Sequence, residues 1–242
     1  MIYDVPESDE DMVRLFSPWN VDGGIVLGYE PDHCEQILKK IGKPLVFVDS
    51  YFGMEAPYDN IGLQDFEGAR ELTSYLLKLG HRRVAFFCDQ NPPIASNLER
   101  LNGFKTALHA YGQEFSKEDF YYIPQDKNLR HEIFRRFARK NAGDYTAAFF
   151  VSDFFANEAI SVFSSQGLRV PDDLSVTGFD DNVYARLSRP MLTTVRQSPS
   201  EKGRRAVEML MKRIRGEEVL LRTIQLPTEL IVRDSVKNIV TL

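Results

Sequence analysis

Short apolar runs alternate with amphipathic segments along most of this chain. Leu72, Leu76 and Leu79 recur at helical spacing, which predicts a helix over 66–79, and Gly80 then ends the pattern. Short apolar runs bounded by Gly, Pro or acidic residues are typical of buried strands. The pattern predicts strands at 2–5, 24–27, 44–48, 84–87, 120–123, 147–151, 174–179, 193–197 and 223–226. It predicts helices at 9–16, 33–41, 66–79, 97–111, 129–140, 154–166 and 201–215.

This alternation predicts βαβ units, parallel sheets and an α/β fold made of two Rossmann-like αβ subdomains. We expect the run at 84–87 to be the last strand of the first half, and the proline-containing segment 90–95 to cross to the second half. The first subdomain would comprise 1–89 and 194–217, and the second 90–193 and 218–235, with 236–242 as a tail. Several crossings would leave a cleft between the subdomains, where small ligands commonly bind.

The segment 167–197 carries the clearest local signals. Gly167 can take the left-handed conformation that closes a helix, and Pro171 prevents that helix from restarting. The apolar strand that follows ends in Asp180 and Asp181. In open α/β sheets ligands bind at the carboxyl ends of the strands, so this acidic pair marks a candidate binding edge.

The composition and the net charge of the chain argue against several classes of protein. The net charge of −5 gives no basic footprint of the kind that nucleic-acid-binding domains carry. No segment approaches the roughly 20 apolar residues of a membrane span, and the acidic N-terminus lacks the basic start and apolar core of a signal peptide. Cys34 and Cys88 fit free thiols in a reducing cytoplasm better than a disulfide. We therefore expect a cytoplasmic protein.

A series of motifs spans nearly the whole chain in a fixed order. They are VDGGIV (21–26), KPLVFVD (43–49), DFEGA (65–69), LGHRRV (79–84), ERLNGF (99–104), GLRVPDDLSVTGFDD (167–181), LTTVRQ (192–197) and LPTELIVRDS (226–235). In residue types and in order, these motifs resemble the sensor domain of the LacI/GalR family of bacterial transcriptional regulators. Any one motif is a weak signal, and the ordered set is a strong one.

The resemblance implies a periplasmic-binding-protein-like fold of type I and a function in repression. A small effector, a sugar or sugar derivative, would bind the domain and alter DNA binding. Nothing in the chain resembles the helix-turn-helix and hinge that begin the family's regulators. Operator DNA would therefore be contacted only through an N-terminal domain that lies outside this sequence. The strand and helix that precede a position like Ile2 in the family are also unmatched.

Arg100 and Asp180 are the leading candidates for ligand contact. By the resemblance, Arg100 holds the effector, since a guanidinium can donate to adjacent hydroxyls or to a carboxylate. The alternative is a structural arginine. Asp180 would accept hydrogen bonds from a sugar diol, or alternatively cap its own loop. Asp181 is expected to cap or to shape the turn.

Further candidates follow other predicted strands. Ser152 occupies a position that often contacts ligand in the family, whereas Phe149 would either stack on a sugar face or belong to the core. Asp153 is a natural helix N-cap. Asp49 and Asp65 could add polar contacts from the first half, and Asp65 could equally cap helix 66–79.

A homodimer is also implied by the resemblance. In the family, helices equivalent to 154–166 pack across a two-fold axis. The apolar side chains that would form this interface, unless they belong to the core, are Phe154, Phe155, Ile160 and Phe163.

The motifs of enzymes are not visible in this sequence. The four histidines are scattered without metal-ligand spacing, and neither a phosphate-binding loop nor a nucleophile elbow is found. Asp180 and Asp181 are adjacent, so strand geometry would point them to opposite faces and disfavours an acid–base pair. We expect no enzymatic activity, cofactor, metal or membrane partner. The main rival is a sugar-binding protein of a transport system with the same two-lobed fold, and a sugar hydrolase is a weaker one.

Overall fold

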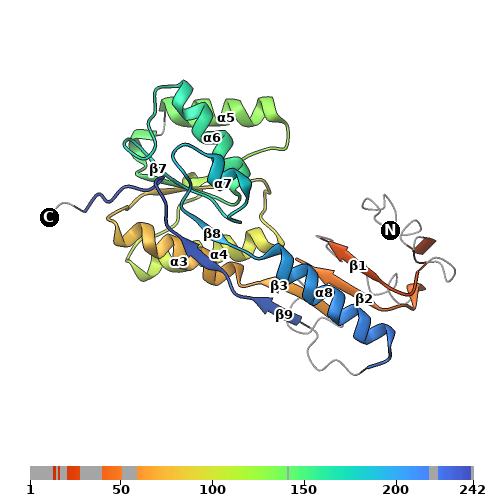
Figure 1. Cartoon of the computed structure of the whole chain (residues 1–242). Coiled ribbons are helices and arrows are strands. Elements are labelled where there is room, and N and C mark those ends of the chain that lie inside the picture. The colour runs from red at the N-terminus through yellow and green to blue at the C-terminus, as the bar shows by residue number, and fades with distance from the viewer. Residues whose placement is uncertain are drawn as a thin grey trace. The chain divides into compact units, whose positions relative to one another are not determined.

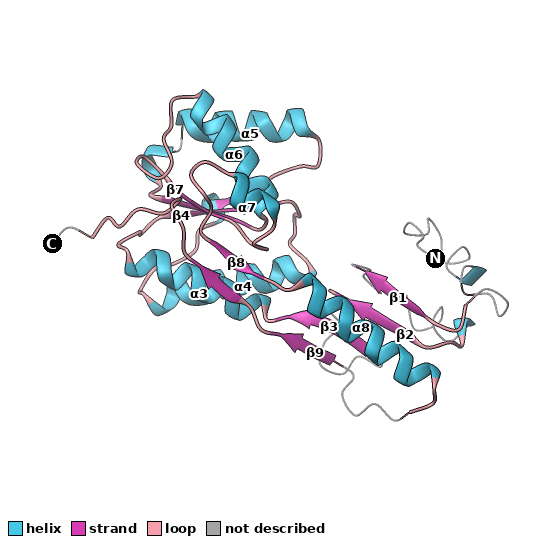
Figure 2. Cartoon of the chain, in the orientation of Figure 1, coloured by secondary structure: helices cyan, strands magenta, loops and turns pink. Residues whose placement is uncertain are grey.

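The computed structural model describes residues 13–14, 16, 21–27, 40–50, 59–140, 142–217 and 223–240. The chain forms two compact units, residues 1–63 with 198–226 and residues 64–197 with 227–242 (Figure 1). Each unit has a parallel sheet and at least one helix of its own (Figure 2). The predicted α/β fold with two αβ units is therefore confirmed. Across the described residues, every helix is too short or too polar to cross a membrane.

The first unit is built on a parallel sheet in the order β1-β2-β3-β9. Its strands are β1 (Gly24–Leu27), β2 (Leu45–Val48), β3 (Asp59–Leu63) and β9 (Thr223–Leu226). Helix α8 (Pro199–Ile214) shares an apolar cluster with this sheet through Ala206 and Met209. The helix begins here because the Ser198 hydroxyl accepts a hydrogen bond from the Glu201 N–H, and proline suits the first helical position.

The second unit contains a parallel sheet in the order β5-β4-β6-β7 and a separate antiparallel pair, β8 with β10. Its strands are β4 (Val84–Cys88), β5 (Phe120–Tyr122), β6 (Ala147–Phe150), β7 (Ser175–Thr177), β8 (Thr194–Arg196) and β10 (Glu229–Ile231). Its helices are α3 (Asp65–Lys78), α4 (Ala95–Ala110), α5 (Lys127–Lys140), α6 (Asp153–Ser165) and α7 (Val183–Leu187). Helices α3 and α4 cover one face of the four-stranded sheet, and α5 and α6 cover the other (Figure 1).

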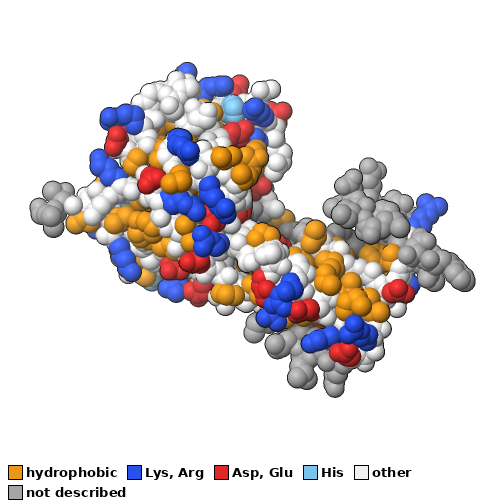
Figure 3. Space-filling model, viewed as in Figure 1, with side chains coloured by type: hydrophobic (Ala, Val, Ile, Leu, Met, Phe, Trp, Pro, Cys, Tyr) orange, Lys and Arg blue, Asp and Glu red, His pale blue; other side chains and the backbone are white. Residues whose placement is uncertain are grey.

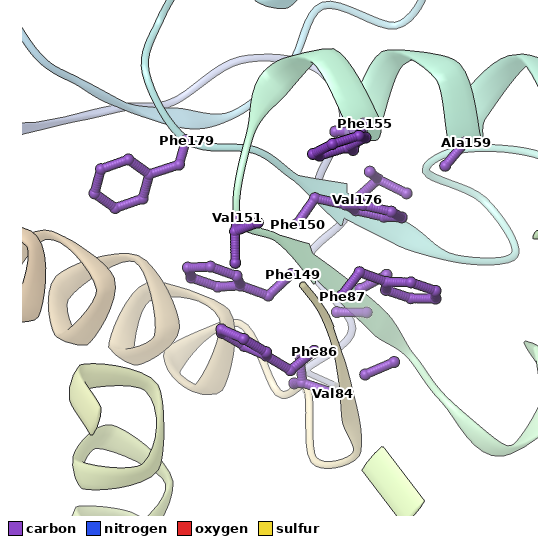
Figure 4. Close-up of a cluster of buried hydrophobic side chains, with 14 of the residues drawn as sticks. Val84, Phe86, Phe87, Phe149, Phe150, Val151, Phe155, Ala159, Val176 and Phe179 are labelled. Atoms are coloured by element: carbon purple, nitrogen blue, oxygen red, sulfur yellow. The ribbon is translucent and has the colours of Figure 1, made fainter. Parts of the chain in front are cut away.

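Phenylalanines from adjacent strands fill both sides of this sheet (Figure 4). Phe86 stacks on Phe149 at a centroid distance of 5.1 Å, and Phe87 stacks on Phe150 at 4.4 Å. Successive side chains on a strand point to opposite faces, so the two stacked pairs belong to different sides. Phe104 of α4 contacts the first pair. Because helices cover both faces, the strands read as continuous apolar runs.

The predicted strand at 84–87 exists as β4, but its assignment to the first half is wrong. β4 pairs with β5 and β6 in the middle of the second unit's sheet. Residues 64–89 therefore belong to the second unit, and the chain first crosses between units after Leu63. The prolines of 90–95 mark the loop from β4 to α4 and not the crossing. The return crossing falls between Gln197 and Ser198, so residues 194–197 also lie in the second unit. The chain crosses once more after Leu226, so the assignment of 218–226 to the second subdomain is wrong, and the tail 236–240 lies in the second unit.

Strand β3 is an element that the apolar pattern does not reveal. Its sequence, DNIGL, combines three residue types that strands usually exclude, yet all five residues are buried. The predicted final strand at 223–226 is confirmed as β9, and the helix at 66–79 is confirmed as α3. The predicted elements at 2–5, 9–16 and 33–41 lie wholly or mostly outside the described residues.

Two helical glycines differ in their surroundings and give a matched test of packing. A Cβ added to Gly103 in α4 would lie 2.2 Å from the carbonyl oxygen of Phe66 in α3, whereas one added to Gly203 in α8 meets nothing within 4 Å. We expect Gly103→Ala to lower the free energy of unfolding by about 2 kcal/mol or more, because the two helices must separate. We expect Gly203→Ala to raise it by about 0.5 to 1 kcal/mol through helix propensity. Urea unfolding of both variants measures this, and equal effects would contradict the close packing of α3 and α4.

Candidate functional site

The carboxyl ends of β6 and β7 meet at one edge of the second unit's sheet. The two strands are parallel neighbours, and each leads directly into a polar segment. β6 is followed by Val151, Ser152 and helix α6, while β7 is followed by Phe179 and the acidic pair. The segment singled out in the sequence therefore lies at the edge where ligands bind in sheets of this kind.

Arg100 reaches this edge from α4 and is almost completely buried. Its Nε donates to Asp65 Oδ1 at 2.8 Å, and its Nη1 donates to the carbonyl oxygen of Val151 at 2.6 Å. The guanidinium lies over the Phe179 ring, 3.9 Å from the centroid, and its Nη2 is 3.9 Å from Asp180 Oδ1. Figure 4 shows Val151 and Phe179 at the same end of the strands. Ion pairing and stacking together hold the guanidinium in a fixed orientation.

Asp180 follows β7 with a backbone φ of 117°, a value that few residues other than glycine adopt. Its N–H donates to the carbonyl of Val195 at 2.8 Å. Its carboxylate accepts hydrogen bonds from Gln197 Nε2 at 2.5 Å and from Ser152 Oγ at 3.3 Å. Burial raises the pKa of Asp180 above its ordinary value, although the charge of Arg100 opposes the shift. One fifth of the side chain stays exposed.

Asp181 has a different role from its neighbour. Its side chain is fully buried, and it receives hydrogen bonds from Arg233 Nη2 at 2.5 Å and Arg196 Nε at 2.7 Å. Burial alone would raise the pKa of Asp181, but the hydrogen bonds and charges of these arginines outweigh it and hold the pKa below its ordinary value. The residue fixes the acidic turn through ion pairs, in keeping with the turn-shaping role expected for it.

Ser152, and not Asp153, caps helix α6, so the predicted N-cap is displaced by one residue. The Ser152 hydroxyl accepts a hydrogen bond from the N–H of Phe154 at 3.3 Å, and Asp153 is the first helical residue. Asp153 is fully buried, where its Oδ1 accepts from Thr194 Oγ1 at 2.6 Å and its Oδ2 from the N–H of Asn182 at 3.0 Å. Burial raises the pKa of Asp153 to about 7.

Asp65 and Asp49 lie in different units. Asp65 is the first residue of α3, and its side chain pairs with Arg100 in the second unit and does not cap the helix. Asp49 belongs to the first unit, directly after β2, where its Oδ2 accepts from Lys202 Nζ at 2.6 Å. A ligand contact by Asp49 stays a prediction.

Phe149 and most of the predicted dimer contacts are core residues. Phe149 is completely buried between Phe86 and Phe104, so the expected stacking on a sugar is wrong. The prediction of a dimer contact is also wrong for three side chains that are at most 7% exposed, namely Phe155, Ile160 and Phe163. Phe154 is 37% exposed and remains available for an interface.

Two residues of the site were not predicted from the sequence. Phe179 supplies the ring under Arg100, and Gln197 holds the carboxylate of Asp180. Both stand inside the motifs GFDD and LTTVRQ, so the motifs contain the signal but do not reveal which side chain faces the site. Within the part of the chain that the structure describes, no group of three His, Cys, Asp or Glu side chains could hold a metal ion.

Comparison with known proteins shows the family to which this chain is related. The family model of the periplasmic binding protein-like domain matches residues 73–236. The HTH-type transcriptional repressor PurR of Mannheimia succiniciproducens is 30% identical over 237 residues, which span 97% of this chain and 70% of the repressor. The chain belongs to the LacI family of transcriptional regulators. The HTH-type transcriptional regulator CelR of Thermobifida fusca is 32% identical over 89% of the chain, which spans 64% of that regulator's length.

Solved structures of LacI-family regulators share the fold. A complex of the regulator CelR with cellobiose superposes with a TM-score of 0.84 at 29% identity, covering 94% of this chain and 69% of that one. A LacI-family regulator from Enterococcus faecium with bound ribose gives a TM-score of 0.81 at 26% identity. The match covers 97% of this chain and 86% of that regulator's chain. These likenesses confirm the periplasmic-binding-protein-like fold.

The raised pKa of Asp153 predicts that the stability of the LacI-family domain depends on pH. The folded pKa of about 7 exceeds the value of 3.8 for an ordinary aspartate, so between these values the folded state holds a proton that the unfolded state lacks. The free energy of unfolding should therefore fall as the pH rises through this window, by on the order of 3 kcal/mol. Asp153→Asn imitates the protonated acid and should lack this part of the slope. Urea unfolding near pH 5 and near pH 8 tests it, and equal slopes for both proteins would refute the assignment.

Proposed function

We propose that this domain binds a small effector, a sugar or sugar derivative, at the carboxyl edge of the second unit's sheet. Binding would regulate transcription through a DNA-reading domain that lies outside this sequence. The observation that carries the proposal is the arrangement of Arg100, Asp65 and Asp180, with one guanidinium fixed between a buried carboxylate and a partly exposed one.

The chemistry of this arrangement suits a polyhydroxylated ligand. A carboxylate accepts hydrogen bonds from adjacent hydroxyl groups, and Asp180 is partly exposed and is held in position by Gln197 and Ser152. A site whose polar groups are already oriented loses less entropy on binding. The relatives CelR and the Enterococcus faecium regulator are described with bound cellobiose and bound ribose, which supports the same ligand class here. We propose binding without turnover.

Regulation requires that the effector favour one conformation. A ligand shifts a conformational equilibrium only by its difference in affinity for the two states. Coupling of about 1 to 3 kcal/mol is typical of such proteins. The PurR relatives are named repressors, and a repressor is the form of regulator we propose. On the face shown in Figure 3, lysines and arginines are interspersed with acidic and apolar side chains.

A thermal-shift screen of sugars, sugar phosphates and purines tests the proposal directly. A ligand at about 100 times its dissociation constant adds roughly 2.7 kcal/mol to the free energy of unfolding. We expect a sugar to raise the melting temperature, with cellobiose, glucose and ribose as the first compounds. A purine as the only ligand that stabilises the domain would contradict the sugar assignment and favour a nucleobase sensor.

Removal of the charge of Asp180 should weaken effector binding and leave the fold intact. Asp180→Asn loses one charged hydrogen-bond acceptor at the exposed side of the site, which is worth about 1.5 to 3 kcal/mol, or a tenfold or greater loss of affinity. Calorimetric titration with the ligand found in the screen measures the loss. Asp172→Asn, at an exposed turn, is the control and should bind like the wild type. Unchanged affinity in Asp180→Asn, together with a normal thermal melt, would remove the site assignment.

We also propose that the domain forms a homodimer. Phe154 is exposed at the start of α6 and contacts Tyr184 of α7 at a centroid distance of 5.2 Å, beside the exposed Val183 and Leu187. These side chains give one apolar face on two adjacent helices. A second copy of the chain would cover it.

Light scattering at micromolar concentration should give the mass of a dimer. Phe154→Asp should shift the protein toward the monomer, because a carboxylate in an apolar interface is costly to desolvate. Leu129→Asp, at an exposed apolar position of α5, is the matched control and should leave the mass unchanged. A wild-type monomer at these concentrations would overturn the proposal.

A further inference from the structure

Residues 235–240, here called the strap, run beside the second unit's sheet at the end of the strands opposite the candidate site. The carbonyl of Ser235 accepts from the N–H of Val176 in β7 at 2.9 Å, and its hydroxyl donates to the Val176 carbonyl at 2.6 Å. The N–H of Lys237 donates to Ser175 Oγ at the start of β7. In the order β5-β4-β6-β7, β7 is the last strand, so the strap covers part of its outer edge (Figure 1). An uncovered edge of this kind can pair with another chain.

The turn between α3 and β4 holds the strap at its other end. The N–H of Ile239 donates to the carbonyl of Leu79 at 2.9 Å. The His81 side chain is buried, and its Nε2 is 3.0 Å from the carbonyl oxygen of Lys237. A carbonyl oxygen can only accept a hydrogen bond, so Nε2 carries the proton. His81 therefore joins the turn to the strap through a single N–H.

The second ring nitrogen of His81 makes this contact depend on the charge of the ring. Nδ1 is buried, and it has no hydrogen-bond partner among the described residues. A protonated ring would carry an N–H at Nδ1 with no acceptor, and an unpaired charged donor is costly to bury. Burial lowers the pKa of His81 below its ordinary value, although the hydrogen bond to the carbonyl of Lys237 opposes the shift. The strap in its closed position therefore favours the neutral ring.

Charged groups on the surrounding elements do not stabilise a protonated ring. The titratable side chains on α3, the turn, the start of β7 and the strap are Tyr75, Lys78, Arg82, Arg83, Asp173 and Lys237. Four of them are cations, and like charges disfavour a further positive charge. The one carboxylate, Asp173, forms its ion pair with Arg169 at 2.8 Å. It does not bond the ring, because Nε2 meets a carbonyl and Nδ1 meets no partner in the described part of the chain.

We propose that the strap is a pH-sensitive cover for the outer edge of β7, held closed by neutral His81 and opened when the ring gains a proton. In the open strap the ring reaches water and regains its ordinary pKa of 6.5. The open form then binds a proton that the closed form lacks, so the closed form loses stability as the pH falls below this value. Near pH 5 the equilibrium constant for opening should be up to about thirtyfold larger than near pH 7.5.

Hydrogen exchange of individual amides tests the inference, with each rate compared with that of an unstructured chain at the same pH. We expect the protection of the Lys237 and Ile239 amides to fall by up to about thirtyfold from near pH 7.5 to near pH 5. The amide of Ile123 donates to the carbonyl of Cys88 at 2.8 Å beside the sheet and serves as the internal reference. Its protection should not fall, because only the strap opens.

Substitutions of His81 assign the effect to its ring. His81→Gln keeps an uncharged donor for the carbonyl of Lys237, so the strap should stay protected at both pH values. His81→Phe cannot donate or gain a proton, so its strap should be less protected than that of the wild type near pH 7.5 and should show no loss toward pH 5. His109→Gln, at an exposed position of α4, is the matched control and should show the full wild-type loss.

Three results would overturn the inference. The first is equal protection of the strap amides at both pH values in the wild type. The second is a loss toward pH 5 that persists in His81→Gln or in His81→Phe, since another group would then cause it. The third is a parallel loss at Ile123, which would mean that the whole unit opens and not the strap alone.

Discussion

The buried ion pair between Arg100 and Asp65 is the interaction on which the organisation of the candidate site in the second unit depends. Asp65 begins α3, Arg100 lies in α4, and the same guanidinium binds the end of β6 through the carbonyl of Val151. It also covers the Phe179 ring beyond β7. One side chain thereby connects two helices and two strands. Removal of either charge would break this buried pair, a change that commonly costs about 3 to 5 kcal/mol.

The acidic turn after β7 depends on a second set of contacts. Asp180 and Asp181 both have positive φ values, a conformation that is costly for residues with side chains. The ion pairs of Asp181 with Arg196 and Arg233 hold the turn from two segments distant in sequence. Asp180 can then remain partly exposed, because the ion pairs of Asp181 hold the turn. A hydrogen-bond acceptor with this support is already oriented in the absence of a ligand.

Much of the fold and part of the site could be predicted from the sequence. Alternating apolar runs and amphipathic helices identified the α/β class, and the ordered motifs placed Arg100 and Asp180 at the site. The sequence could not show to which unit β4 belongs, because a fully buried strand has the same continuous apolar pattern in either sheet. For the same reason Phe149 and Phe150 could not be separated from ligand-facing aromatics. Strand β3 was missed because its burial is imposed by the neighbouring strands β2 and β9 and not by its own residue types.

The three aspartates at residues 153, 180 and 181 show why residue type alone does not predict the behaviour of a site. Asp153 and Asp181 are both buried, yet their pKa values move in opposite directions. Asp153 receives hydrogen bonds from uncharged groups only, so desolvation dominates and favours the proton. Asp181 receives two guanidinium groups, so ionisation is favoured despite burial. Asp180 lies between these cases, near one guanidinium that is already paired. Its partly exposed carboxylate is the acceptor that we propose for the effector.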